Sequence, residues 1–267
     1  MTMAQEQQTQ DQTVPTAQID LNSDLGEGLG RWEMGDDEAL LAVVTSANIA
    51  CGFHASDASI MRRTCEQAVA NDVRIGAHVG YRDLLGFGRR SMDVPPDELA
   101  NDVIYQIGAL AACARVAGGA VSYVKPHGAL YNRIVWDEDQ AGAVVDAIRN
   151  YDPSLVVLGL PGSRFLALAE QAGLKTVREG FVDRAYNDEA QLVSRRVPGS
   201  VLHEPDLIGS RAVQMAEKGT VVSVNGKTVS PRPQSLCLHG DTPGAADIAK
   251  HVRTSLERAN ITVVPFA

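Results

Sequence analysis

Short apolar or β-branched runs alternate along this chain with longer segments in which apolar residues recur every three or four positions. The short runs predict β-strands, and the longer segments predict α-helices. The clearest helix follows Pro95 and Pro96 and ends before Gly118, and residues 58–70 and 205–218 have the same pattern. The predicted strands cover residues 18–22, 46–53, 74–79, 121–126, 155–160, 175–181, 220–224, 235–240 and 261–266.

This alternation continues without a linker or a break in composition, an order typical of a parallel sheet covered by helices. Unusual polar residues follow nearly every predicted strand. That distribution favours a closed barrel, because a barrel collects its chemistry from many strand ends, whereas an open sheet binds at one switch point. The prediction is one α/β domain over residues 18–267, a TIM-like (β/α) barrel of seven or eight mainly parallel strands.

Two segments depart from the repeat. Residues 184–204 are too long for an ordinary connection and too polar for a strand, so they predict an excursion over the site. Residues 220–230 contain Asn225-Gly226 between β-rich flanks and predict a hairpin. The hairpin ends like a phosphate-binding loop, but six residues separate its first glycine from Gly226-Lys227, where such a loop has about four. If ATP is used, we therefore expect another chain to bind it.

The net charge of the chain limits the classes of molecule that such a domain is expected to bind. The 267 residues include 24 basic and 33 acidic side chains, a formal net charge of −9. This balance disfavours nucleic acid and anionic membranes, so a small molecule or another protein is the expected partner. No apolar run approaches the roughly 18 residues of a membrane span. A homo-oligomer is compatible with the sequence.

The N-terminus and the cysteines favour the cytoplasm. Residues 1–17 are rich in Gln and Thr and lack the basic start and apolar core of a signal peptide, so they predict a disordered tail. The cysteines are scattered and form no Cys-x-x-Cys pair, which indicates neither a disulfide framework nor a zinc knuckle. They are Cys51, Cys65, Cys113 and Cys237.

Acidic and basic side chains follow the predicted strands, and in a parallel barrel these strand ends meet on one face. Four of the six histidines lie at or just after a strand. We therefore expect a shared pocket. Its candidate residues are Asp24, Glu27, His54, His78, Lys125, His127, Glu179, Asp183, Arg184, His239 and Asp241. Arg89 and Arg90, after the sequence GFG, suit a carboxylate or phosphate group.

Simpler interpretations exist for single residues. Asp57 stands before a helical pattern and predicts an N-cap, and Asp241 with Thr242 before Pro243 predicts another. A lone histidine at a strand end is usually a hydrogen-bonded structural residue. Isolated roles of this kind do not explain why so many histidines fall at strand ends.

Two interpretations of the chemistry in this pocket are possible, one without a metal ion and one with it. Carboxylates with histidines can supply a general acid and a general base, and Lys125 can hold a positive charge against an oxyanion or a phosphate. Alternatively, a divalent metal binds, with ligands drawn from Asp24, His54, His78 or His127, and activates water. The spacing of the residues does not separate these versions.

Several segments resemble, in order and spacing, the signature segments of the LamB/YcsF family, the A subunits of 5-oxoprolinase. They are DLNSDLGEG, NIACGFHASD, IGAH followed by GFGRR, VKPHGALYN, EGFVDRAY and LCLHGD. The resemblance runs from about residue 18 to the C-terminus. It implies a barrel of the glycoside hydrolase/deacetylase type, ATP-dependent opening of 5-oxoproline to L-glutamate with release of ADP and phosphate, and partner subunits B and C. Because this chain has no phosphate-binding loop, we expect these partners to bind ATP. Ser56 stands where this family usually has glycine.

Within this family function, the catalytic candidates are Asp24, His127 and Asp183 as acid or base and Lys125 as the cation for an oxyanion or phosphoryl group. Arg184 or Arg90 is expected to bind the substrate carboxylate. The other candidates line the substrate site. Two alternatives stay open, namely a metal-dependent N-deacetylase on the same barrel and a non-catalytic subunit that only binds a metabolite.

Overall fold

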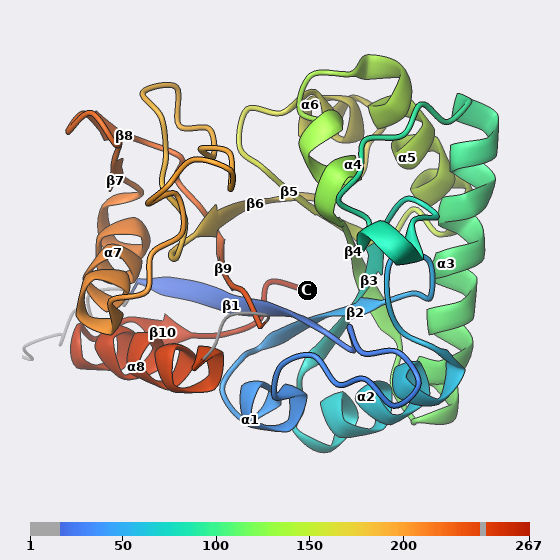
Figure 1. Ribbon diagram of the computed structural model, residues 1–267, viewed down its shortest axis with the longest axis horizontal. Coiled ribbons are helices and arrows are strands. Elements are labelled where there is room, and N and C mark those ends of the chain that lie inside the picture. The colour runs from blue at the N-terminus through green and yellow to red at the C-terminus, as the bar shows by residue number, and fades with distance from the viewer. Residues whose placement is uncertain (1–16, 241–243) are drawn as a thin grey trace, which may run out of the picture.

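Seven parallel strands close into a barrel in the computed structural model, which describes residues 17–240 and 244–267 (Figure 1). The closure is made by β1 and β9, which pair in parallel. The strands are β1 Gln18–Leu25, β2 Ser46–Ala50, β3 Arg74–Val79, β4 Val121–Pro126, β5 Val156–Gly159, β6 Thr176–Phe181 and β9 Ser235–Leu238. The predicted barrel is confirmed, with seven strands. The predicted tail over residues 1–17 lies outside the described residues except for Ala17.

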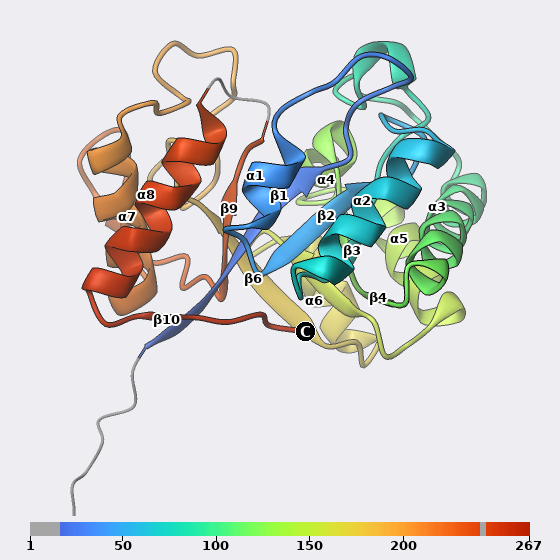
Figure 2. The ribbon, with the colours of Figure 1, turned by 90° about the horizontal axis from the view of Figure 1, so that it is seen from below.

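Helices surround the barrel and cover the outer faces of its strands (Figures 1 and 2). The helices predicted over residues 58–70 and 205–218 are confirmed with those bounds. The helices are α1 Asp37–Leu41, α2 Ala58–Ala70, α3 Pro96–Val116, α4 Gly128–Arg133, α5 Glu138–Tyr151, α6 Arg164–Gln171, α7 Pro205–Lys218 and α8 Ala245–Arg258, with a 3-10 turn at Leu84–Gly86.

Helix α3 shows how local sequence produces these elements. Pro96 stands in its first turn, where a missing N–H costs nothing, and Asp97 and Glu98 favour the positive end of the helix dipole. Its apolar residues fall on one face, which is buried against β3, β4 and α5. That face consists of Leu99, Val103, Ile107, Leu110 and Ala114.

Two predicted strands stay outside the barrel. The segment at residues 220–230 forms the predicted hairpin, with β7 Val221–Val222 antiparallel to β8 Thr228–Val229. The C-terminal strand β10 Thr262–Val263 pairs only with the first residues of β1. Beyond β10 the chain crosses the N-terminal end of the barrel (Figure 2), where the Phe266 ring lies 4.9 Å from that of Tyr123. This segment covers the end of the barrel opposite the strand C-termini.

Strand β1 is longer than predicted. It continues to Leu25 because both of its edges are paired, with Asn22 opposite Ser46 of β2 and Ser23 opposite Leu238 of β9. Asp24 therefore belongs to the strand and does not stand in the turn after it. Residues 184–204 form the predicted irregular excursion, which leaves the C-terminal end of β6 and is held by isolated bridges such as Arg184–Val201.

Asp20 is a buried carboxylate in β1 that makes stability depend on pH. It accepts hydrogen bonds from Thr45 Oγ1 at 2.7 Å, from Ser46 Oγ at 2.6 Å and from Ser235 Oγ. Burial nevertheless disfavours its charged form and raises its pKa from 3.8 to about 6. The folded chain holds this proton more tightly than the unfolded chain, so stability is lost as the pH rises between these two values.

Replacing Asp20 by Asn is expected to remove this part of the pH dependence. Wild-type protein should lose roughly 3 kcal/mol of unfolding free energy to this group as the pH rises from well below 3.8 to well above 6, and the Asp20→Asn variant should not. Urea denaturation at a series of pH values measures the difference. The exposed control Asp247→Asn should follow the wild type, and parallel curves for wild type and Asp20→Asn would contradict the expectation.

Candidate active site at the barrel rim

Charged side chains from distant parts of the chain meet at the C-terminal ends of the strands. Asp24 comes from β1, His78 from β3, Lys125 from β4 and Glu179 from β6. His78, Lys125 and Glu179 are buried. Such polar residues are costly to bury without partners, so their mutual contacts determine what the site can do.

Lys125 is the centre of one half of the site. Its Nζ donates a hydrogen bond to Asp24 Oδ1 at 2.9 Å and lies 2.8 Å from Glu179 Oε1. Cys237 Sγ and Asn22 Oδ1 are each 3.3 Å away. Burial disfavours the ammonium, but the negative field, chiefly that of Asp24, outweighs it and raises the pKa of Lys125 well above its usual value. The site thus holds a permanent cation shielded from water.

Asp24 connects this lysine to the histidines. Its Oδ1 also accepts a hydrogen bond from Asn48 Nδ2 at 2.8 Å, and its Oδ2 lies 3.4 Å from His78 Nε2. Burial would raise the pKa of Asp24, but His78 and Lys125 outweigh it and hold this pKa well below the usual value. Asp24 is therefore ionised and is a poor proton donor.

A histidine–carboxylate pair lies beside the lysine. His239 Nδ1 is 2.6 Å from Asp183 Oδ2, and its ring stacks on Phe181 with centroids 5.6 Å apart. Residues 17–240 and 244–267 provide no hydrogen bond to His239 Nε2. A carboxylate that accepts a hydrogen bond from Nδ1–H leaves the lone pair of Nε2 available for proton transfer, the arrangement of a general base with its orienting partner.

The other half of the site consists of Glu27, His54, His78 and His127, which we call the histidine cluster. Glu27 Oε1 lies 3.1 Å from His54 Nε2 and 3.4 Å from His127 Nδ1. His127 Nδ1 lies 3.0 Å from His78 Nε2. The rings of His54 and His127 stack in parallel, with centroids 3.7 Å apart. Four potential ligand atoms of the cluster lie within 4.8 Å of one another, so it could hold a metal ion.

The histidines of the cluster differ in charge. Burial, followed by repulsion from the neighbouring histidines, lowers the pKa of His127 well below its usual value, and burial and His78 do the same for His54. For His78, burial is outweighed by the carboxylate of Asp24, so its pKa is raised. His127 has contacts at both ring nitrogens, Phe87 O at Nε2 and His78 at Nδ1. His127 is therefore less suited to proton transfer than His239.

The loop at residues 86–90 packs directly on the histidine cluster. Gly88 has φ +62°, and a Cβ atom there would lie 2.7 Å from both His54 Cβ and His127 Cδ2. Only glycine combines this conformation with so close an approach. The GFG sequence thus closes one side of the cluster.

Two predicted substrate-binding residues, Arg90 and Arg184, are not brought into these contacts. Arg90 pairs with Asp83, and its side chain is 66% exposed. Arg184 is buried beside Asp183, but its guanidinium donates a hydrogen bond to the carbonyl of Val193 at 2.6 Å. Asp241 lies outside the described residues, as do its predicted capping partners. The described part of α8 has Gly244 as its N-cap.

Sequence reasoning missed several neighbours of Lys125. Asn22, Asn48 and Cys237 were not among the candidates, yet two of them contact the ammonium directly and Asn48 contacts Asp24. A signal was present, because Asp20, Asn22 and Asp24 alternate along one strand and so face the same side. In a barrel that side is the interior.

The predicted cap at Asp57 is confirmed. Its side chain accepts hydrogen bonds from the backbone N–H groups of Ser59 and Ile60 at the start of α2, and also from that of Gly30. Asp57 is thus a structural residue that ties the loop after β1 to this helix.

Ser56 occupies the position before this cap, where the backbone conformation favours glycine. It has φ +76°, in the left-handed region that strains an L-residue. We expect Ser56→Gly to raise the unfolding free energy by roughly 0.5–1 kcal/mol, because relief of strain exceeds the added entropy of the unfolded chain. Urea denaturation measures this. Ser210→Gly, inside α7, should shift stability in the opposite direction, and a destabilised Ser56→Gly variant would show that no strain is stored at this position.

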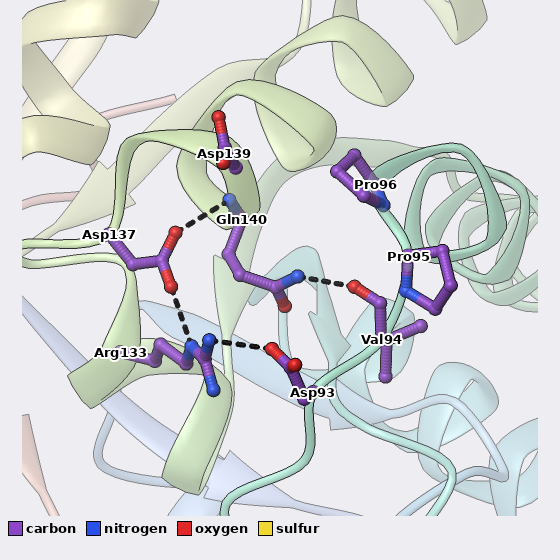
Figure 3. A pocket seen from close by; sticks show the side chains of 8 residues that line it. All are labelled: Asp93, Val94, Pro95, Pro96, Arg133, Asp137, Asp139 and Gln140. Atoms are coloured by element: carbon purple, nitrogen blue, oxygen red, sulfur yellow. Dashed lines mark hydrogen bonds and ion pairs between the residues drawn. The ribbon is translucent and has the colours of Figure 1, made fainter.

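A separate hollow of about 210 Å³ lies beside α4 and α5, and its lining residues make polar contacts with one another (Figure 3). Arg133 bridges Asp137 and Asp93, at 2.7 and 2.8 Å, and Gln140 Nε2 donates to the carbonyl of Val94. Since these groups satisfy one another, we assign this hollow a structural role.

Among the described helices, none has the length and the apolar character needed to cross a membrane.

Comparison with known proteins covers nearly the whole chain. The model of the LamB/YcsF family matches residues 19–267. A protein from Streptomyces avermitilis, named as the A subunit of 5-oxoprolinase, is 62% identical over 249 residues, which are 93% of this chain and 100% of that relative. A protein from Pseudomonas syringae with the same name and the number 3 is 53% identical, covering 93% and 97%. The crystal structure of a lactam utilization protein from Thermus thermophilus superposes with a TM-score of 0.89 at 40% identity, covering 93% and 100%.

Proposed function

Because the chain belongs to the LamB/YcsF family, we propose that it is the A subunit of an ATP-dependent 5-oxoprolinase, which opens the lactam ring of 5-oxoproline to give L-glutamate. The observation that carries this proposal is the buried ammonium of Lys125, held by two carboxylates beside a histidine–carboxylate pair. A lactam resists water because amide resonance makes its carbonyl carbon a poor electrophile. A site that opens it must stabilise charge on the carbonyl oxygen and move protons.

The chemistry divides between the two halves of this arrangement. ATP transfers its terminal phosphoryl group to the lactam oxygen and leaves as ADP. Water then adds to the same carbon and the ring C–N bond breaks, which frees the amine and leaves an acyl phosphate. A second water hydrolyses this acyl phosphate to the carboxylate and phosphate. Lys125 offsets the negative charge on the oxygen and the phosphoryl group. His239 Nε2 takes a proton from the attacking water and returns one to the ring nitrogen, while Asp183 holds the ring in place.

Of the two arginines predicted for the substrate carboxylate, we propose Arg184. It is 7% exposed and follows Asp183 directly in the sequence. Its Nε has no hydrogen-bond partner among the described residues, although its terminal nitrogen is bound to Val193. A buried donor without a partner is costly, and a carboxylate would satisfy it. Arg90, paired with Asp83 and largely exposed, is less suited to this role.

We propose that partner B and C subunits bind ATP. The segment that ends like a phosphate-binding loop is the β7–β8 hairpin, in which Gly226 forms the turn, and it does not lead from a strand into a helix. The names of the relatives, which specify one lettered subunit of an enzyme, support an assembly of several chains.

The test is glutamate release from 5-oxoproline by the purified chain, alone and with co-expressed B and C subunits, with and without ATP. We expect release only from the complete assembly and only with ATP. No release from any combination would overturn the proposal. Acetate release that needs no ATP and is lost with a chelator would favour the deacetylase alternative. Tight binding of 5-oxoproline without turnover would favour the non-catalytic alternative.

A further inference from the structure

The hydrogen bonds of the histidine cluster determine which of its nitrogens carry protons. His78 Nδ1 lies 3.0 Å from the carbonyl oxygen of Lys125, and His127 Nε2 lies 2.8 Å from the carbonyl oxygen of Phe87. A carbonyl oxygen can only accept, so both of these nitrogens must donate. A neutral imidazole has one N–H group. When both rings are neutral, His78 Nε2 and His127 Nδ1 therefore present lone pairs.

These two lone pairs point at each other across 3.0 Å, with Glu27 Oε1 at 3.4 Å from His127 Nδ1 and 3.8 Å from His78 Nε2. Two lone pairs and a carboxylate oxygen at such distances repel one another unless a positive charge lies between them. The cluster is buried, so water does not screen this repulsion.

The spacing of the cluster fits a small metal ion. Zinc binds histidine nitrogen and carboxylate oxygen at about 2.0–2.1 Å, which places neighbouring ligand atoms of a tetrahedron about 3.3 Å apart. Four separations between ligand atoms of the cluster are 3.0, 3.1, 3.4 and 3.8 Å. The backbone carbonyls behind His78 and His127 are also the outer contacts that hold ligating histidines in one tautomer and orientation.

We propose that Glu27, His54, His78 and His127 bind one divalent transition-metal ion of the zinc class. Three imidazole nitrogens and one carboxylate favour such an ion over Mg²⁺ or Ca²⁺, which prefer oxygen ligands. The ion lies next to Asp24, whose Oδ2 is 3.4 Å from His78 Nε2, and so borders the lysine half of the site. This inference rests on the geometry of the cluster and does not depend on the proposed lactam chemistry.

A second group of close ligand atoms, from Asp24, Cys237 and His239, is a weaker candidate. The ammonium of Lys125 lies 2.9 Å from Asp24 Oδ1 and 3.3 Å from Cys237 Sγ, where it would repel a metal cation. His239 already bonds Asp183 through Nδ1. The positive charge that this second group needs is supplied by Lys125 itself.

The test is metal binding by the isolated full-length chain, stripped with a chelator and titrated with Zn²⁺ or Co²⁺. We expect one tightly bound ion per chain, a rise in Tm on binding, and the visible absorption of Co²⁺ held by nitrogen ligands. Glu27→Gln and His127→Gln should each weaken the affinity by at least about 100-fold. His203→Gln, at an exposed histidine, and Cys237→Ser, in the second group, should bind as the wild type does.

Two results would overturn this assignment. One is a stripped chain that takes up no ion while remaining folded by circular dichroism, which would mean that a proton occupies the space between His78 and His127. The other is binding that is unchanged in both cluster variants. The metal-binding assay contains neither substrate nor partner chains, so its result is independent of the lactam assay. A chain that binds metal, but whose complete assembly opens no lactam, would refute the proposed function and leave the metal site intact.

Discussion

Replacing Lys125 by methionine is expected to lower kcat for glutamate release by the complete assembly by at least about 10²–10³-fold, because the site loses the buried cation that we propose offsets charge on the lactam oxygen. Methionine matches the length of the apolar part of the lysine side chain and removes the charge. The effect should fall mainly on kcat, since we propose that Lys125 offsets negative charge on the lactam oxygen and the phosphoryl group during phosphoryl transfer.

The same variant is expected to lose stability. Asp24 and Glu179 would face each other without the ammonium that lies 2.9 and 2.8 Å from them, and breaking a buried ion pair costs about 3–5 kcal/mol. The double variant Lys125→Met with Glu179→Gln removes one of the two uncompensated carboxylates and should recover part of this stability. It should not recover activity, so the comparison separates a folding defect from a catalytic one.

The measurements are kcat and KM for the assembly and urea denaturation of the isolated chain, for the single and double variants. Lys227→Met is the matched control, because the Lys227 side chain projects from the exposed hairpin and donates a hydrogen bond to the carbonyl of Asp188. It should leave both quantities unchanged. A Lys125→Met assembly with wild-type kcat would remove Lys125 from the mechanism.

Replacing Asp183 by asparagine is the second large expected effect, a fall in kcat of about 10²–10⁴-fold with the fold retained. The carboxylate accepts a hydrogen bond from His239 Nδ1–H across 2.6 Å. An amide can instead donate to Nδ1, which moves the ring proton to Nε2. His239 would then face the substrate with an N–H group and could not take a proton from water.

Measurements of KM, Tm and kcat distinguish a change of the His239 tautomer from a loss of folded structure in the Asp183→Asn variant. Asp183→Asn should leave KM and Tm close to wild-type values while kcat falls, and His239→Gln should lower kcat by a similar factor. Combining the two should add little, because both act on the same proton transfer. Asp247→Asn, at an exposed position in α8, is the control. Wild-type kcat in Asp183→Asn would exclude the pair as the general base.

Much of the architecture could be predicted because it depends on neighbours in the sequence. The bounds of α2 and α7, the cap at Asp57 and the hairpin around Gly226 follow from periodicity and turn residues within a few positions. The order of strands and helices also indicated a parallel barrel, and strand-end positions indicated that polar side chains would gather on one rim. Family membership followed from motifs spread over nearly the whole chain.

Tertiary structure alone decided how those residues pair. The barrel has seven strands because β9 reaches β1, while β10 pairs only with the start of that strand. Pairing across the barrel placed Lys125 between Asp24 and Glu179, and His239 against Asp183. It also left Arg90 at an exposed ion pair and gave His127 contacts at both nitrogens.

The physical reason is the range of the interactions. Helix periods, caps and turns are set by atoms a few residues apart, so the sequence states them directly. The contacts of the site join residues dozens to more than a hundred positions apart, such as Asp24 with Lys125. They depend on strand register, where a shift of one residue turns a side chain to the other face. Only the closed barrel sets that register and thereby the charge of each group at the rim.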